Sequence, residues 1–296
     1  MRMAKKHVGM IGLGIMGSAM AANLIKAGFR VTGYDPDPAR RRRLVRDGGI
    51  AVGSAREAFE ATDIAISSLP SAEALLTNSK GFPSKKAIVI ETSTLPIGVK
   101  ERAAKILATN GATLLDCPLS GTGAQAKNGD LVVFGSGSLS QFKKSLRVMK
   151  GFSRAQYYVG PFGNGSKMKF VANLLVAIHN VSSAEALVLA RRSGLNPAMT
   201  LNVLSDSAAT SRMLQVRGPM MVKRAYRPAT MSNRLWQKDM KIIGAFAREL
   251  KSPVPLFDAT KAVYKQTLGD LAEADTAAVA AVLERRAALM RRRTRF

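Results

Sequence analysis

The chain has 296 residues, enough for one large domain or two ordinary ones, and 47% of them are hydrophobic. It has no apolar run of about 18 residues, which argues against a membrane partner. Its start is too short on charge and reaches glycines too soon for a signal peptide. Cys117 is the single cysteine, which excludes an intramolecular disulfide and a cysteine-rich metal site. His7 and His179 are too few and too far apart to suggest a metal. We therefore expect a cytoplasmic protein that needs no metal.

The net charge of +25 is the unusual feature of the composition, and it is spread over both halves of the chain. Such a charge favours phosphates and anionic substrates. Nucleic acid is an unlikely partner, because the sequence contains neither zinc-finger spacing nor basic stretches interleaved with aromatic residues.

The first half of the chain alternates strand and helix patterns. Strands are predicted at 7–14, 29–35, 63–70, 86–94, 112–118 and 130–137. Helices are predicted at 18–28, 37–47, 54–61 and 96–110. This alternation indicates the α/β class, with an N-terminal Rossmann-type, doubly wound parallel sheet.

From residue 165 onward the pattern is helical throughout. Residues 166–194 predict one long helix with Ser166 as its N-cap, apolar nearly all round and therefore buried. Further helices are predicted at 197–206, 210–224, 231–250, 254–269 and 275–294. We expect a dinucleotide-binding domain at 1–164. An all-α domain at 165–296, serving the substrate and oligomerisation, would be opened by this long interdomain helix.

The stretch GLGIMG at 12–17 follows a strand and opens a helix, the context in which GxGxxG predicts a dinucleotide site. Gly12 permits the tight turn, Gly14 the approach of a pyrophosphate, and Gly17 close packing of the helix. Leu13, Ile15 and Met16 complete the loop. The helix N-terminus then offers N–H groups to the phosphates.

Asp35 ends the second predicted strand, where a carboxylate accepts hydrogen bonds from a ribose hydroxyl and so favours NAD. The four arginines at 40–43 are close enough in sequence to hold a 2′-phosphate. NAD is therefore the expected cofactor, and NADP remains possible.

Five further stretches, together with this loop, resemble the β-hydroxyacid dehydrogenase family, which includes 3-hydroxyisobutyrate dehydrogenase and tartronate semialdehyde reductase and belongs to the 6-phosphogluconate dehydrogenase NAD-binding superfamily. They are SLP at 68–70, ETST at 91–94, DCPLSGTGAQAKNGDL at 116–131, GNGSKMKFVAN at 163–173 and QKDM at 237–240. The loop at 116–131 departs from the family pattern at Thr122 and Gln125, where glycines are usual, so the resemblance supports the chemistry better than a particular substrate.

The resemblance implies a hydride transfer between NAD(P) and a small 3-hydroxy acid or its semialdehyde. Lys169 would be the general acid/base, with Asn173 orienting the substrate oxygen. Helical spacing selects the same pair, since residues four apart share a face while Lys167 points about 200° away from Lys169. A carboxylate held by Ser120, Gly121 and Thr122 is also implied, as are cofactor contacts from Leu69, Pro70, Thr94 and Lys238.

Several alternatives stay open at the level of sequence. Glyoxylate or succinic semialdehyde reduction would use the same residues in the other direction. An imine reductase on this scaffold would lack the lysine. A nucleotide- or polyanion-binding protein without turnover is supported by the net charge only. A homodimer or homotetramer through the helical domain is implied mainly by the resemblance.

Overall fold

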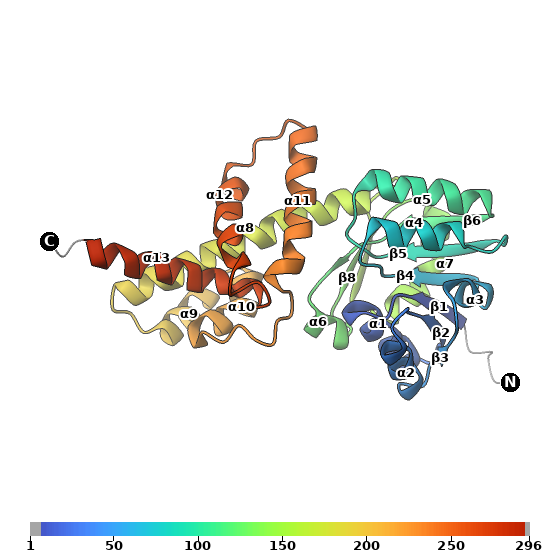
Figure 1. The fold of residues 1–296 in the computed structure, drawn as a ribbon, viewed down its shortest axis with the longest axis horizontal. Helices are drawn as coiled ribbons and strands as arrows, with labels where there is room; N and C mark the ends of the chain where they lie inside the picture. The colour runs from blue at the N-terminus through green and yellow to red at the C-terminus, as the bar shows by residue number, and fades with distance from the viewer. Residues whose placement is uncertain (1–6, 294–296) are drawn as a thin grey trace. The chain divides into compact units, whose positions relative to one another are not determined.

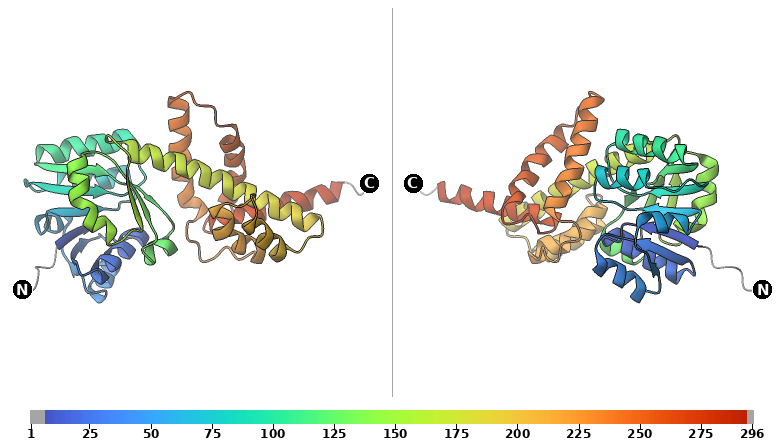
Figure 2. Two further views of the ribbon diagram at one scale, coloured as in Figure 1. Left: turned by 180° about the vertical axis from the view of Figure 1, so that it is seen from behind. Right: turned by 45° about the vertical axis from the view of Figure 1, so that its right-hand side comes forward.

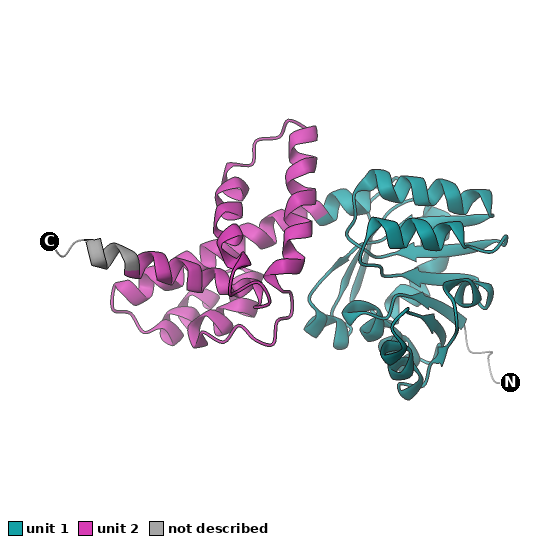
Figure 3. Ribbon diagram, in the orientation of Figure 1, with its two compact units in different colours: residues 1–169 teal, residues 170–296 magenta. Residues whose placement is uncertain are grey.

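The chain divides into two compact units, Met1–Lys169 and Phe170–Phe296, in the computed structural model (Figure 3). The structure describes residues 7–293, with side chains to residue 288. Each unit has its own architecture, and each is described separately.

The first unit is built on a six-stranded sheet in which every neighbouring pair is parallel. Its spatial order is β3-β2-β1-β4-β5-β6. The strands are β1 (His7–Ile11), β2 (Arg30–Tyr34), β3 (Ile50–Ala51), β4 (Ile64–Ser67), β5 (Ala87–Glu91) and β6 (Ala112–Asp116). The order reverses between β1 and β4, and ligands of such sheets bind where the carboxyl ends of the strands meet at that point. This confirms the predicted Rossmann-type sheet.

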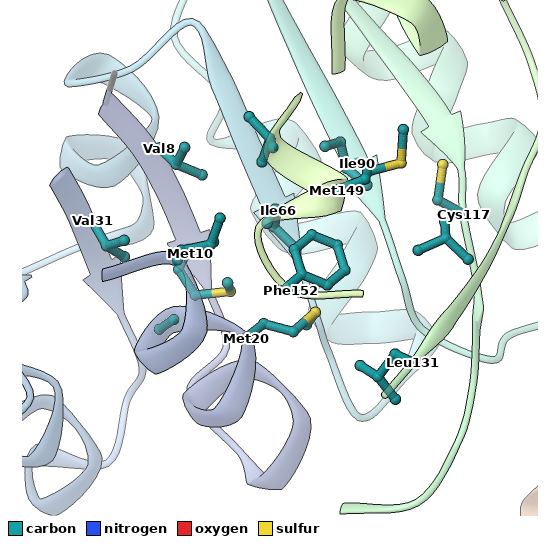
Figure 4. Packing of buried hydrophobic residues seen from close by; sticks show 14 of the residues in the cluster. Val8, Met10, Met20, Val31, Ile66, Ile90, Cys117, Leu131, Met149 and Phe152 are labelled. Carbon is teal, nitrogen blue, oxygen red and sulfur yellow. The ribbon is translucent and has the colours of Figure 1, made fainter. Parts of the chain in front are cut away.

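Helices cover both faces of this sheet (Figures 1 and 2). One apolar cluster joins the sheet to α1 (Ile15–Lys26), α2 (Pro38–Arg46) and α7 (Leu139–Lys150), and Figure 4 shows Met10, Met20, Met149 and Phe152 within it. A second cluster joins the other face to α3 (Ala55–Glu60), α4 (Ala72–Lys80) and α5 (Ile97–Thr109). Apolar side chains on both faces explain the near-continuous hydrophobic runs of the strands.

A second, three-stranded sheet follows β6, in the order β7-β8-β9. Its elements are β7 (Leu119–Ser120), β8 (Val132–Gly135) and β9 (Ala155–Tyr158), with α6 (Gly123–Lys127) between the first two strands. The predicted strand at 130–137 is therefore β8, which pairs antiparallel with β7. The sequence pattern missed β3 and β7, because two residues show no periodicity, and it missed β9. It also missed α4, α6 and α7, which the capping residues Ser71, Thr122 and Ser138 mark.

The second unit is helical, as predicted. Its elements are the larger part of α8 (Asn164–Arg192), then α9 (Pro197–Asp206), α10 (Arg212–Lys223), α11 (Asn233–Glu249), α12 (Pro255–Lys265), the short 3₁₀ turns η1 (Gln266–Leu268) and η2 (Thr276–Ala278), and α13 (Val279–Arg293). Asn180 ties α8 to this bundle, since its amide donates to the Tyr264 hydroxyl and to the Thr276 carbonyl, both at 2.8 Å.

The long helix α8 is not buried all round, and that expectation was wrong. Its buried positions in the second unit recur at helical spacing, at 170, 173, 177, 180, 181, 183, 184, 187 and 190. Val171, Leu175 and Leu189 are exposed in the single chain. By length and composition α8 could cross a membrane, but a core helix passes the same test. Its buried Asn173 and Asn180 are bonded within the helical unit, as in a core helix.

Candidate active site

The glycine loop after β1 is packed so tightly that side chains are excluded at two of its three glycines. Gly12 has a φ of 89°, and a Cβ there would lie 2.2 Å from the carbonyl oxygen of Ser68. A Cβ on Gly17 would lie 1.9 Å from the carbonyl oxygen of Gly12. At Gly14 the nearest atom to a Cβ is Nη1 of Arg40, 4.0 Å away. The open space therefore lies at the glycine where a pyrophosphate would approach.

The N-terminus of α1 has no side-chain cap at Gly14, a feature that it shares with α5, which follows Pro96. Side chains cap the helices α2, α3, α4, α6 and α7 of the same unit. The first N–H groups of a helix have no partner within the helix. Those of α1, in the loop that includes Leu13, Ile15 and Met16, can therefore serve a phosphate, and the loop fits a dinucleotide.

The side chain of Asp35 is hydrogen-bonded to the glycine loop. It is buried, its Oδ2 accepts from Leu13 N at 2.8 Å, and its Oδ1 accepts from Asp37 N at 2.9 Å. Arg40 Nη1 lies 3.3 Å from Oδ2. Arg41 donates to the Asp35 carbonyl oxygen at 2.6 Å. Two arginines thus stand at the end of β2, where the adenosine ribose of a dinucleotide is expected.

The loops after β4 and β5 are joined to each other at the carboxyl edge of the sheet. Leu69 N donates to Ser93 Oγ at 2.8 Å, which links the SLP and ETST stretches. Pro70 is exposed, and Thr94 is half-buried. These side chains therefore lie at the same sheet edge as the glycine loop.

The segment at 120–125 begins at Ser120, the last residue of β7, and continues into α6. Gly121 has a φ of 138°, in the range that favours glycine. The two departures from the family pattern form one structure, a capping box in which the Thr122 side chain accepts from Gln125 N, while Thr122 N donates to Gln125 Oε1 at 3.0 Å. The amide and the hydroxyl of Thr122 are thus both directed at Gln125 Oε1, within the loop itself.

This segment lies beside the glycine loop. A Cβ on Gly123 would lie 2.6 Å from Cγ2 of Ile15, and Asn23 donates to the Ala126 carbonyl at 2.7 Å. The first unit therefore brings the predicted cofactor loop and the predicted substrate loop together.

The helix α8 begins at Asn164, two residues before the predicted N-cap. Gly163 has a φ of 94°, and a Cβ on Gly165 would lie 2.4 Å from the Phe134 carbonyl and 2.5 Å from the Asp116 carbonyl. The expectation that Ser166 is the N-cap was wrong, because side chains from other elements accept the first amides of the helix. Ser136 Oγ accepts from Gly165 N at 2.9 Å, and Asp116 Oδ2 accepts from Ser166 N at 2.8 Å.

Beneath this helix start lies a fully buried ion network. Nζ of Lys100, on α5, lies 2.7 Å from Oε2 of Glu91 and 2.8 Å from Oδ1 of Asp116. Burial by itself lowers the pKa of Lys100, but the two carboxylates outweigh burial and raise the pKa above its usual value. The ammonium therefore stays charged inside the protein, which is consistent with the cost of burying an unpaired charge.

Lys169 and Asn173 follow on α8, one helical turn apart. Lys169 is half-buried, whereas Lys167 is exposed and its Nζ lies 3.4 Å from Asn164 Oδ1. In the second unit Asn173 is buried, and its Nδ2 donates to Asp239 Oδ2 at 2.9 Å. Lys238 Nζ lies 3.1 Å from Asp239 Oδ1. The structure thus joins the predicted Asn173 and Lys238 through Asp239.

Comparison with known proteins decides the family. Residues 7–160 match the family model for the NAD binding domain of 6-phosphogluconate dehydrogenase, and residues 163–283 match the NAD-binding domain of NADP-dependent 3-hydroxyisobutyrate dehydrogenase. The chain belongs to the β-hydroxyacid dehydrogenase family. It is an NAD(P)-dependent oxidoreductase of that family.

Relatives of known name agree. The L-threonate dehydrogenase of Cupriavidus necator is 31% identical over 285 residues, covering 93% of this chain and 95% of the relative. The 3-hydroxyisobutyrate dehydrogenase of Pseudomonas aeruginosa is 31% identical over 261 residues, covering 84% and 88%. The crystal structure of a 3-hydroxyisobutyrate dehydrogenase from Salmonella typhimurium superposes with a TM-score of 0.84 at 26% identity, covering 94% of this chain and all of the other.

Sequence reasoning missed four charged residues of this β-hydroxyacid dehydrogenase that are bonded to α8, directly or through one another, three in the first unit and one in the second. They are Glu91, Lys100, Asp116 and Asp239. Three of them stood in the quoted stretches ETST, DCP and QKDM, but a motif does not say which of its charged residues face inward. Nothing in the sequence around Lys100 indicates that it is buried, because a lysine in a helix is usually solvated.

Proposed function

We propose that this enzyme oxidises a small 3-hydroxy acid, or reduces the corresponding semialdehyde, with Lys169 as the general acid/base. The observation that carries the proposal is the arrangement of the α8 segment. Lys169 and Asn173 stand on one helix face, and Asn173 is buried and held by Asp239. A buried, oriented amide one turn from a half-buried lysine is suited to fixing a substrate oxygen for proton transfer.

In this mechanism the bound nicotinamide supplies the redox chemistry by accepting or returning hydride at its C4. Lys169 Nζ takes the proton of the C3 hydroxyl during oxidation and returns a proton to the carbonyl oxygen during reduction. Asp239 accepts one amide hydrogen of Asn173, which leaves its second amide hydrogen and its carbonyl oxygen for the substrate.

The substrate carboxylate is bound by Ser120 and the Gly121 amide. Thr122 N is bonded to Gln125, so the role of Thr122 is to shape this loop through its capping box. An anionic substrate also suits the net charge of +25. The relatives named above act on L-threonate and 3-hydroxyisobutyrate, and these two compounds are the first candidates.

The cofactor contacts come from Gly12 to Gly17, Asp35, Leu69, Pro70 and Thr94 in the first unit, with Lys238 serving the cofactor or the substrate anion. NAD is the expected cofactor and NADP is possible, because Arg40 and Arg41 stand beside Asp35. Residues 1–164 would form the dinucleotide-binding domain and 165–296 the substrate and oligomerisation domain.

The enzyme would act in the cytoplasm as a homodimer or homotetramer. Exposed apolar side chains on α8 and α9 of the helical unit support self-association, among them Val171, Leu175, Leu189, Met199 and Val203. Sedimentation of the purified protein at several concentrations tests this, and a monomer at all of them would refute it.

The decisive experiment has two parts. A panel of small hydroxy acids and semialdehydes, read by nicotinamide absorbance, identifies the substrate. Lys169→Ala should then lower kcat by about two to four orders of magnitude, the usual contribution of a positioned general acid or base. Lys167→Ala, the exposed lysine two residues earlier, is the matched control and should turn over normally. Normal turnover by Lys169→Ala would refute the assigned role.

A further inference from the structure

The buried ion network under α8 involves no residue to which the proposed reaction gives a role. Lys100, Glu91 and Asp116 are all completely buried. One ammonium and two carboxylates leave an excess negative charge in the interior, which is costly unless further donors compensate it. The additional donors are therefore informative about what the network does.

Those donors belong to the start of α8. Ser166 donates two hydrogen bonds to Asp116, one from its amide to Oδ2 at 2.8 Å and one from its hydroxyl to Oδ1 at 2.8 Å. Ser136 Oγ, which accepts from Gly165 N, itself donates to Asp116, 3.1 Å from the backbone oxygen and 3.2 Å from Oδ2. Two amides of the first turn of α8 are thus bonded to side chains from other elements.

Asp116 also contacts Lys100, which links it to Glu91 at the end of β5. Lys100 Nζ contacts the same Oδ1 that accepts the Ser166 hydroxyl, and it bridges to Glu91 at the end of β5. Glu91 Oε1 in turn accepts from Ser93 N at 3.0 Å, in the loop whose Ser93 hydroxyl binds Leu69 N. The ends of β5 and β6, the loop after β4 and the start of α8 are connected through Lys100.

The helix start has little freedom to move elsewhere. Gly165 lies against the carbonyls of Phe134 and Asp116, so that even one methyl group would not fit. A carboxylate at a helix N-terminus also interacts favourably with the positive end of the helix dipole. Both effects hold the first turn of α8 at one position and in one direction.

We propose that Lys100, Asp116 and Ser166 are positioning residues that set where Lys169 stands relative to the dinucleotide loops. Lys169 comes three residues after Ser166, so a shift or rotation of the first turn is passed directly to the lysine. Displacing a reacting group by about 1 Å can lower a rate about 10²-fold. This inference rests on the proposed function, since it gives Lys169 the proton transfer.

A double-mutant cycle tests the positioning role. Ser166→Ala removes one hydroxyl and keeps the backbone contact, and Lys100→Met removes the ammonium while keeping most of the volume. We expect kcat to fall about tenfold in Ser166→Ala and about 10²-fold in Lys100→Met, with KM and the cofactor dissociation constant nearly unchanged. Ser182→Ala, exposed on the same α8, and Lys105→Met, exposed on the same α5, are the matched controls.

The same changes are then made in the Lys169→Ala background. If Ser166 and Lys100 act by positioning Lys169, they have nothing left to position, and kcat should not fall further. An equal fall in both backgrounds, or an unchanged kcat in Ser166→Ala, overturns the positioning role and leaves the proposed function standing. If Lys100→Met fails to fold, the cycle that combines Ser166→Ala with Lys169→Ala still tests the positioning role. Normal turnover by Lys169→Ala itself would instead overturn the proposed function.

Discussion

The Lys100 network of the first unit and the Arg217–Asp275 pair of the second unit are both buried, and they differ in what they hold in place. Lys100, Glu91 and Asp116 connect strand ends to the helix that carries Lys169. Arg217 Nε lies 3.1 Å from Asp275 Oδ1, and Thr230 donates to Asp275 Oδ2 through both its amide, at 2.8 Å, and its hydroxyl, at 2.7 Å.

The second network therefore fastens α10 to the segment before α11 and to η2. It reaches none of the residues proposed for the reaction. Balanced charges, one cation and one anion, suit a purely structural role, whereas the first network carries an excess negative charge that the start of α8 compensates. We expect the mild change Ser166→Ala in the first network to reduce catalysis ahead of stability, and the change Arg217→Met in the second to reduce stability ahead of catalysis.

The largest effect that is confined to stability is expected for Arg217→Met. It leaves the Asp275 carboxylate buried without its cation, and breaking such a pair costs about 3–5 kcal/mol. Urea unfolding of the variant measures this loss. Lys223→Met, at an exposed position of the same α10, should cost almost nothing. Cofactor affinity of the folded fraction should stay normal, and a parallel loss of affinity would break the distinction between the two networks.

Asn173 and Asn180 are buried amides on one helix, seven residues apart, and offer a second contrast. Asn173→Ala should lower kcat/KM about 10²-fold, because Asp239 then has no partner amide and the substrate oxygen no donor. Asn180→Ala should instead lower the free energy of unfolding by about 1–3 kcal/mol, because the Tyr264 hydroxyl and the Thr276 carbonyl lose their donor. Kinetics and urea unfolding of both variants test the pair, and a catalytic loss of the same size in Asn180→Ala would contradict it.

Acid should weaken the second unit through Asp275. Burial raises the pKa of Asp275, but Arg217 and the hydrogen bonds from Ala277 and Thr230 outweigh burial and hold the pKa below its usual value. A group with a lowered pKa stabilises the fold above its unfolded pKa of about 4, and this stability is lost as the pH falls through the folded value. The difference in free energy of unfolding between the wild type and Arg217→Met, measured by urea unfolding, should therefore shrink as the pH falls below about 4, because a protonated Asp275 no longer gains from Arg217. A difference that does not change with pH would show that Arg217 does not set this pKa.

The smallest effect is expected at Arg40, half of whose side chain is exposed beside Asp35. Arg40→Met should weaken the binding of NADP more than that of NAD. We expect the ratio of their KM values to change about fivefold, since an exposed charge pair contributes at most about 1 kcal/mol. Arg46→Met, exposed at the end of the same α2, is the control. An equal change for both cofactors would show that Arg40 does not face the 2′ position.

The sequence predicted the fold well because strand and helix periods are local properties. It identified the parallel sheet, the helical second half and the glycine loop, whose spacing reflects close packing at Gly12 and Gly17. It could not identify contacts between residues distant in the chain. The bond of Ser166 to Asp116 spans 50 residues and that of Asn173 to Asp239 spans 66, and no local pattern specifies them.

Two errors have the same origin. The sequence predicts that α8 starts at Ser166, because a serine is a good N-cap and nothing nearby in the chain reveals that Asp116 and Ser136 accept the first amides. Complete burial of α8 was expected from its composition, yet which face is covered depends on how the later helices pack.

The central claim, that Lys169 transfers the proton, is tested most directly by chemical rescue of Lys169→Ala. The variant should bind cofactor normally and turn over about 10²- to 10⁴-fold more slowly than the wild type, and added methylamine should raise its rate in proportion to concentration. Methylamine should leave Lys167→Ala unaffected. A Lys169→Ala variant that turns over at the wild-type rate without any amine would contradict the claim.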